Sequence, residues 1–357
     1  MSTLARWLAG VAVVAGAAFV GFIALFSAYG FSQGFDVASG LKHLLAEDFD
    51  AAEAQRAFED VPWQRVSWVA DIESRALNES SGLAASNLHE GVLWSINDSG
   101  SGPAIYAMDL EGRDLGVWPV ETEQAVDWES MDAFVWQDTS YLIIGDTGDN
   151  FRWRREVQFL VVEEPADLAA AGAALPVAWR VTFSYPQGYR DSEALAVDAA
   201  NEQVYVLSKR RHPPQLFRLP LRADAPVVAE YVRTLTDFPR PMAWEIEEDD
   251  GQIYRHTPVG MDLANGRLLI ATYKHAYVYL IDALEQPPLR IRMPSVGQRE
   301  AVSFASGRDD VAFVSRERSK GRGVADLFMI EFALDPSDSA SVRASARTLP
   351  EAIAAEQ

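Results

Sequence analysis

The chain has 357 residues and no cysteine, which excludes disulfide bonds and any metal site held by thiolates. It carries 52 Asp and Glu against 31 Lys and Arg, a formal net charge of −21. This argues against nucleic acid as a partner, because counterion displacement from phosphates needs a concentrated basic surface. Its 48% hydrophobic content is sufficient for a packed core, so we expect one large or two ordinary globular domains.

The first element in chain order is an apolar stretch, residues 7–29, without a charged side chain. As a helix with 1.5 Å rise per residue, it is long enough to cross a hydrocarbon core of about 30 Å. A cleavable signal peptide, the alternative, has a shorter apolar region and a small-residue cleavage site. We predict an uncleaved transmembrane signal anchor over residues 1–30, with the membrane as partner through residues 7–29. Arg6 precedes the stretch and Asp36 follows it, so the remainder is expected on the extracytoplasmic side, periplasmic or extracellular.

The next segment, residues 37–60, spaces apolar side chains as a helix does, among acidic ones, and Pro62 follows it. This pattern predicts a helical stalk or linker over residues 31–62. We place the main domain at residues 63–349 and a tail at 350–357.

A repeat occupies the main domain. Its apolar segments are short, rich in Val, Ile and aromatic residues, and bounded by turn residues, which is typical of all-β proteins. One pattern occurs five times: an acidic residue, a strand of small apolar residues, a second apolar strand and a polar cluster. The copies begin near Glu79, Asp127, Asp191, Pro258 and Arg299, and the fourth lacks the Glu. The nearly constant interval between Glu and polar cluster indicates one supersecondary unit that was copied.

Two further strands follow each pair, for example residues 104–109 and 115–120, which makes a four-stranded unit. Four antiparallel strands are the blade of a β-propeller. We therefore predict an all-β fold, a β-propeller with five four-stranded blades; six blades and a β-sandwich remain alternatives. The strand at residues 66–72 precedes the first copy, and we expect it to close the ring by joining the last blade.

Alternating strand direction places the recurrent Glu and the polar cluster at the same end of each blade. The first two clusters end in acids and amides, and carboxylate and amide oxygens are the ligands of Ca²⁺. Like carboxylates that meet are unfavourable unless a proton or a cation balances them. The predicted Ca²⁺ ligands are Glu79, Asp98, Asp127, Glu129, Asp146 and Asp149. Alternatively, the Glu residues accept backbone N–H groups of neighbouring blades and fasten the ring.

The other three clusters end in bases, which would suit an anionic group such as phosphate or carboxylate. Arg152, Arg154 and Arg155 follow the second cluster and could add to this basic half, or could be a solvated surface group. The candidate catalytic residues are Lys209, Lys274, Arg316 and His275. The candidate ligand-binding residues are Asn97, Asn150, Arg210, Glu193 and Glu300. Common hydrolase and nucleotide signatures are absent from the sequence. If the protein is an enzyme, the predicted metal and bases lead us to expect metal-assisted hydrolysis of an ester or phosphoester.

Several motifs occur in order: Glu79-Ser-Ser-Gly-Leu-Ala, Leu93-Trp-Ser-Ile-Asn-Asp-Ser-Gly, Asp127-Trp-Glu, Gly145-Asp-Thr-Gly-Asp-Asn, Val259-Gly-Met-Asp and Arg299-Glu-Ala-Val. Together they resemble a poorly characterised family of exported bacterial β-propeller proteins, over roughly residues 66–332. More distantly, the pattern is similar to β-propeller phytases, esterase-like phytase domains and gluconolactonase-type propellers. The resemblance implies a propeller with a metal at one mouth of the ring, and it does not supply a complete catalytic constellation residue by residue.

The sequence thus predicts a membrane-anchored, extracytoplasmic propeller that binds Ca²⁺ and an anionic ligand, either a small molecule or a protein partner. The alternative is a non-catalytic binding platform or scaffold at the envelope, in which the recurrent Glu residues have a structural role.

Overall fold

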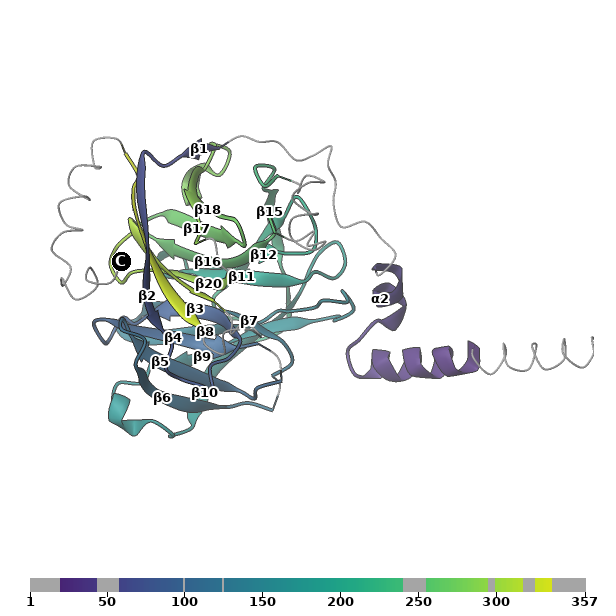
Figure 1. Cartoon of the computed structure of the whole chain (residues 1–357). Helices are drawn as coiled ribbons and strands as arrows, with labels where there is room; N and C mark the ends of the chain where they lie inside the picture. Colours follow the sequence, from purple (N-terminus) through teal and green to yellow (C-terminus); the bar gives the residue numbers. More distant parts are fainter. Residues whose placement is uncertain are drawn as a thin grey trace, which may run out of the picture.

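The structure is a computed structural model that describes residues 20–43, 58–98, 100–123, 125–239, 255–294, 299–316 and 325–335. Residues 20–32 and α2 (Val37–His43) are helical and lie outside the β-rich body (Figure 1). Within these described ranges, no helix is both long and apolar enough to span a membrane. Residues 1–19 of the predicted anchor and the predicted tail at 350–357 lie outside the described residues.

Five antiparallel meanders of four strands follow one another in the described part of the chain. The first contains β3 (Ser80–Ala85), β4 (Val92–Asn97), β5 (Ala104–Asp109) and β6 (Asp114–Glu121). The second contains β7 (Trp128–Trp136), β8 (Thr139–Asp146), β9 (Val157–Glu163) and β10 (Leu175–Ser184). The third contains β11 (Ser192–Asp198), β12 (Gln203–Ser208), β13 (Gln215–Pro220) and β15 (Glu230–Thr234).

The fourth meander contains β16 (Pro258–Ala264), β17 (Arg267–Thr272), β18 (His275–Leu280) and β19 (Leu289–Arg292). The fifth contains β20 (Arg299–Phe304), β21 (Val311–Arg316), β22 (Asp326–Ala333) and, from the start of the domain, β2 (Trp63–Asp71). Shorter elements lie between them: β1 (Glu59–Asp60), β14 (Val227–Val228) and the 3₁₀ turns η1 (Leu168–Ala170), η2 (Ala199–Asn201) and η3 (Ile281–Ala283).

The first strands of the five meanders, β3, β7, β11, β16 and β20, pack against one another in that order, and β20 returns to β3. Figure 1 shows β3, β11, β16 and β20 near the middle of the body and β2, β6 and β10 nearer its rim. Five buried apolar clusters fill the interfaces between successive meanders; Trp94 and Trp118, for example, pack with Met131 and Leu142 of the next meander. The arrangement is propeller-like, and it agrees with the predicted order of strands.

The N-terminal strand completes the last meander, as predicted. β2 pairs antiparallel with β22, with Trp63 opposite Ala333 and Asp71 opposite Asp326. Arg65 of β2 also forms an ion pair with Glu331 of β22. Residues from the two ends of the domain therefore share one sheet and close the ring.

Buried polar side chains of the inner strands fasten neighbouring meanders through backbone groups. Asp132 of β7 accepts a hydrogen bond from Val197 N of β11 at 2.7 Å, and Asp262 of β16 accepts one from Phe304 N of β20 at 2.6 Å. Ser303 Oγ of β20 accepts from Ala85 N of β3 at 3.0 Å. These acceptors satisfy backbone N–H groups that would otherwise be buried without partners.

The predicted stalk differs from the structure at its end. Helix α2 covers Val37–His43, and residues 44–57 lie outside the described residues. Glu59–Asp60 form strand β1, which pairs in parallel with β19, and Asp60 accepts two hydrogen bonds from the guanidinium of Arg290. This pairing supplies backbone hydrogen bonds that a helix ending before Pro62 would not make with the body.

Candidate functional site

Each inner strand has a β-bulge near its start, and the bulge determines which side chains face the mouth of the ring. The registers shift around one residue in every meander, and the five bulged residues are Ser81, Glu129, Glu193, Val259 and Glu300. A bulge redirects the side chain that it inserts. Glu129, Glu193 and Glu300 are thus structurally equivalent, whereas Glu79 lies two residues before the first bulge and corresponds to Asp127 and Asp191. The four predicted Glu residues do not occupy equivalent positions.

The residue that follows each second strand returns to the same mouth. In four meanders this residue is Asp98, Thr147, Lys209 or Tyr273, because the last paired residues of those strands are 97, 146, 208 and 272. Lys209 Nζ donates to Glu193 Oε2 and, at 3.1 Å, to Tyr273 Oη, while Tyr273 Oη donates to Glu300 Oε1. One hydrogen-bonded row therefore joins the third, fourth and fifth meanders, and its Glu residues bond to side chains.

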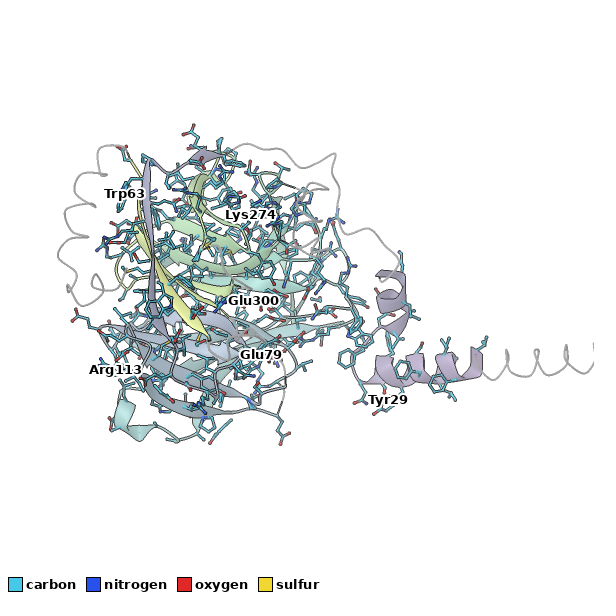
Figure 2. All side chains as sticks on the ribbon, in the orientation of Figure 1. Tyr29, Trp63, Glu79, Arg113, Lys274 and Glu300 are labelled. Carbon is cyan, nitrogen blue, oxygen red and sulfur yellow. The ribbon has the colours of Figure 1, made fainter. Side chains whose placement is uncertain are left out.

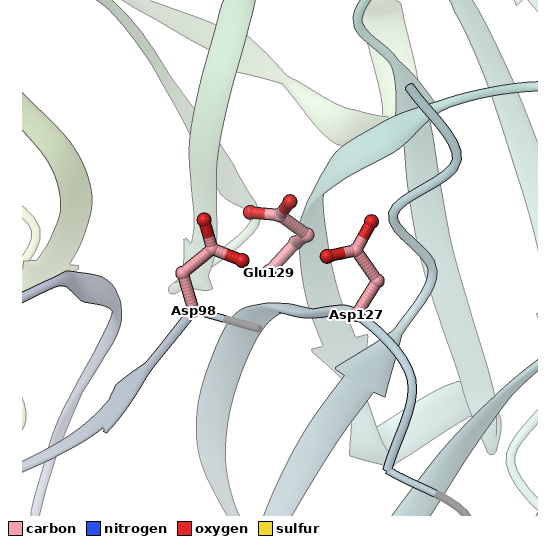
Figure 3. Close-up of side chains that lie close together, drawn as sticks. All are labelled: Asp98, Asp127 and Glu129. Atoms are coloured by element: carbon pink, nitrogen blue, oxygen red, sulfur yellow. The ribbon is translucent and has the colours of Figure 1, made fainter. Parts of the chain in front are cut away.

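Three carboxylates converge beside this row. Asp98 follows β4, Asp127 precedes β7 and Glu129 is the bulged residue of β7. One ligand oxygen from each lies within 4.8 Å of the others, and Figure 3 shows the three carboxyl groups directed toward a common space. Glu129 is buried, with 3% of its surface exposed, while Asp98 and Asp127 are partly exposed. The group has the donor chemistry and spacing to hold a metal ion.

Burial and like charge oppose ionisation of this acidic cluster. Burial raises the pKa of Asp127 to about 7, and the Asp98 carboxylate contributes in the same direction. Burial also raises the pKa of Glu129 well above its ordinary range, and the negative charges of Glu193 and Asp98 raise it further. The positive charge of Lys209 lowers the pKa of Glu129. This single ammonium is, however, shared by three carboxylates, those of Glu129, Glu193 and Glu300. Such a cluster is balanced either by protonation of its carboxylates or by a bound cation.

Asn97, a predicted ligand-binding residue, and Asp146, a predicted metal ligand, instead hold the loops that carry the predicted metal ligands Glu79 and Asp127. Asn97 Oδ1 accepts from the backbone N–H groups of Asn78 and Glu79, both at 3.0 Å. At the equivalent place in the second meander, Asp146 accepts from Val126 N at 3.3 Å and Asp127 N at 3.0 Å. Asp146 is fully buried and also pairs with Arg154 at 2.9 Å. The shared role of Asn97 and Asp146 explains why acids and amides end these two strands.

The loop after Asp146 packs closely behind the acidic cluster. Gly148 lies so near that a Cβ there would be 2.5 Å from Asp127 Cγ and 2.7 Å from Glu129 Cγ. Asp149 is directed into its own loop, where it accepts from Trp153 N at 3.0 Å and Arg154 N at 2.8 Å. Burial raises the pKa of Asp149 to about 6 despite these bonds. Glycine at 148 thus permits the close approach that positions Asp127 and Glu129.

The predicted basic residues of the third and fifth meanders are each paired with acids. Lys209 pairs with Glu193, and Arg210 pairs with Asp191 at 2.7 Å and donates to Asn150. Arg316 pairs with Asp326 of the adjacent strand. These pairs reduce the positive charge that the basic half can present to an anion.

Lys274 and His275 follow Tyr273 at the turn from β17 into β18. His275 opens β18 opposite Arg292, and Figure 2 shows Lys274 well separated from Glu79. Burial, followed by the charge of Arg290, lowers the pKa of His275 to about 3, which keeps the imidazole neutral. The largest charges that act on His275 thus come from Arg290, His256 and Lys274 and not from the converging carboxylates.

Tyr273 and Gly148 take part in this mouth and were not among the predicted site residues. The signal for Tyr273 was its position directly after a second strand, which it shares with Asp98 and Lys209.

No protein-family model matches the chain, and no curated protein matches its sequence. Solved structures that resemble it include a luciferin-regenerating enzyme, with 9% identity, a TM-score of 0.41 and coverage of 76% of this chain and 96% of that one. A gluconolactonase from Xanthomonas campestris has 12% identity, a TM-score of 0.40 and coverage of 78% and 94%. The PQQ-bound aldose sugar dehydrogenase from Streptomyces coelicolor has 12% identity, a TM-score of 0.38 and coverage of 76% and 100%. These likenesses concern the fold alone. The propeller-like arrangement is defined independently by the packing of the inner strands β3, β7, β11, β16 and β20 in a closed order.

Proposed function

We propose that this protein is a five-bladed β-propeller that binds Ca²⁺ at one mouth through Asp98, Asp127 and Glu129. The observation that carries the proposal is the convergence of three carboxylates, one of them buried, within 4.8 Å. Ca²⁺ takes six to eight oxygen ligands in flexible geometry, and three carboxylates offer two oxygens each. Carboxylate oxygens alone suit Ca²⁺ better than Zn²⁺, which prefers nitrogen and sulfur ligands.

The charge balance of the mouth supports this proposal. The acidic cluster continues into Glu193 and Glu300, and Lys209 is already shared between these two and Glu129. A divalent cation at Asp98, Asp127 and Glu129 would offset the repulsion that raises the pKa values of Asp127 and Glu129. The metal would also link the first meander to the second, because Asp98 follows β4 of the first meander and Asp127 precedes β7 of the second.

An anionic ligand bridged to the metal is the second part of the proposal. Asp98 and Asp127 are partly exposed, which leaves the outward side of a bound cation open to water or to an acidic group. Metal-assisted ester or phosphoester hydrolysis is therefore a second candidate function. Because Lys209, Arg210 and Arg316 are paired with acids, the geometry favours ligand binding over charge stabilisation by these bases.

We also propose that residues 7–29 anchor the domain in a membrane, with the propeller on the extracytoplasmic side. The described end of this stretch supports the idea, because large apolar side chains remain exposed on the helix at residues 20–32. These side chains are Val20, Phe22, Leu25, Phe26, Tyr29 and Phe31. Figure 2 shows Tyr29 outside the β-rich body. Several large exposed apolar side chains on one helix are typical of contact with lipid or another apolar partner.

Calorimetric titration of the EDTA-treated full chain in detergent with CaCl₂ tests the metal proposal. We expect one saturable site that is lost in Glu129→Gln and Asp127→Asn and retained in Glu111→Gln, which changes an exposed acid elsewhere. Absence of binding in the unsubstituted chain would contradict it. A parallel assay with generic phosphoesters and lactones separates the two functions: calcium-dependent turnover that Glu129→Gln abolishes supports a hydrolase, and binding without turnover supports a platform.

A further inference from the structure

The segment after the N-terminal helix is docked on the loop that follows Asp146. Phe35 and Arg154 form an antiparallel bridge, in which Asp36 N donates to Trp153 O at 2.6 Å and Arg155 N donates to Gly34 O at 2.9 Å. These are main-chain bonds between parts of the chain more than a hundred residues apart in sequence. Figure 1 shows α2 beside the body, at the end of this segment.

Side chains add to this docking. The Phe35 and Trp153 rings meet edge to face with centroids 5.5 Å apart, and the Arg155 guanidinium lies 4.2 Å from the centroid of Phe31. Tyr189 Oη of the body donates to Asp36 Oδ2 at 3.2 Å. At Gly40 the fit is close, because a Cβ there would lie 3.3 Å from Trp153 Cε3 and 3.4 Å from Phe151 O.

The residue that pairs with Phe35 also supports the metal site. Arg154 is buried, and its guanidinium binds Asp146 Oδ1 at 2.9 Å and Gly148 O at 2.8 Å. Asp146 in turn accepts from Asp127 N, and Gly148 N donates to Asp127 O at 3.3 Å. Two bonded steps therefore connect Arg154, which pairs with the docked segment, to Asp127, a candidate metal ligand.

We infer that residues 34–40 form part of the metal site's support, and that Arg154 couples docking of this segment to occupancy of the site by a divalent cation. The inference rests on the proposed metal binding at Asp98, Asp127 and Glu129. Docking fixes the backbone around Arg154, which orders Asp146, Gly148 and thereby Asp127 before the cation arrives. Since coupling free energies are reciprocal, the bound cation strengthens docking by the same factor. A pull or a partner that releases the segment would therefore weaken cation binding.

The experiment compares two glycine substitutions in the full chain. Gly40→Ile puts a branched side chain against Trp153, whereas Gly21→Ile adds the same group where a Cβ would meet nothing within 4 Å. Because the chain has no cysteine, Leu41→Cys and Glu156→Cys provide unique positions for two spin labels that report docking. Ca²⁺ affinity is measured by calorimetry in the corresponding unlabelled proteins.

We expect Gly40→Ile to lengthen and broaden the label distances and to weaken Ca²⁺ binding by about fivefold or more, while Gly21→Ile changes neither. Added Ca²⁺ should partly restore the short distances in Gly40→Ile. If the labels show that Gly40→Ile stays docked, Phe35→Asp, which places a charge against the Trp153 ring, takes its place. Undocking with unchanged Ca²⁺ affinity overturns the coupling alone, whereas no Ca²⁺ binding in the unsubstituted chain overturns the proposed metal site and the coupling together.

Discussion

Gly148 lies against Asp127, and the space between them is too small for a methyl group. A Cβ at residue 148 would be 2.5 Å from Asp127 Cγ, and backbone Gly148 N donates to Asp127 O at 3.3 Å. The loop and the carboxylate therefore have to move together. This relationship makes residue 148 the most direct steric test of the acidic cluster.

Gly148→Ala should displace Asp127 and Glu129 and weaken Ca²⁺ binding by about tenfold. This is the smaller end of the loss in metal affinity that is typical when residues supporting metal ligands are replaced. Calorimetric titration measures this, with Gly21→Ala as the matched control because a Cβ at residue 21 meets nothing within 4 Å. Equal affinities in Gly148→Ala and the unsubstituted protein would show that the cluster does not hold the cation.

The stability of the metal-free protein should fall as pH rises. Burial raises the pKa of Asp127 to about 7 in the folded protein, against an ordinary value of 3.8, so folding favours its protonated form. This contribution is complete below about pH 4 and is lost as pH rises through about 7. Asp149, with its pKa raised to about 6, acts in the same direction.

Urea unfolding in EDTA between pH 4 and pH 8 measures this dependence. The decrease in unfolding free energy should be smaller in Asp127→Asn, and Ca²⁺ should stabilise the protein more at pH 8 than at pH 5, because the ion competes with protons for the carboxylates. Identical pH profiles for the two proteins would contradict the raised pKa of Asp127.

Lys209→Met should be strongly destabilising, because it removes the ammonium that pairs with buried Glu193, whose pKa burial raises to about 8. Removing one partner of a buried ion pair typically costs about 3–5 kcal/mol. Urea unfolding provides the measurement, and the double variant Lys209→Met, Glu193→Gln should regain part of the loss. Arg113→Met, at an exposed ion pair with Asp109, is the control and should change stability little. A small effect of Lys209→Met would mean that Glu193 is readily protonated.

Asp132→Ala should weaken the junction between the second and third meanders. It removes the acceptor of Val197 N, and a buried donor left without a partner costs about 1–3 kcal/mol. Asp132→Asn keeps an acceptor oxygen and should lose less. Both variants should retain Ca²⁺ affinity, since Asp132 fastens the ring at a place separate from the three converging carboxylates. A loss of Ca²⁺ affinity without a loss of stability would show that Asp132 supports the metal site and not the junction.

The repeat unit was predictable because alternation and turn residues act locally. Strands such as residues 104–109 appear in the structure at the predicted positions, and the first strand pairs with the last as expected. The acidic cluster was partly predictable for the same reason, since Asp98 and Asp127 each flank a strand of the repeat.

The exact equivalence of the Glu residues was not predictable, because a bulge changes the count by one residue without changing the apolar pattern. Glu79 therefore seemed equivalent to Glu129, although Ser81 occupies that place. Charge pairing was also hidden: Arg316 meets Asp326, a partner from the next strand, and this depends on register rather than on local pattern. The lowered pKa of His275 was hidden for a similar reason, since the charge that acts on it most comes from Arg290 on the following strand.

The pairing of β2 with β22 has a consequence for the order of events during synthesis. The ribosome delivers residues 63–71 early and residues 326–333 near the end, so the first strand must wait, unpaired, until almost the whole domain has emerged. Closing a loop of this length carries an entropic penalty that later contacts must overcome, which slows the final step of folding. A nascent or truncated chain that stops before residue 326 would expose both edges of an open ring, and unpaired strand edges are sites of aggregation.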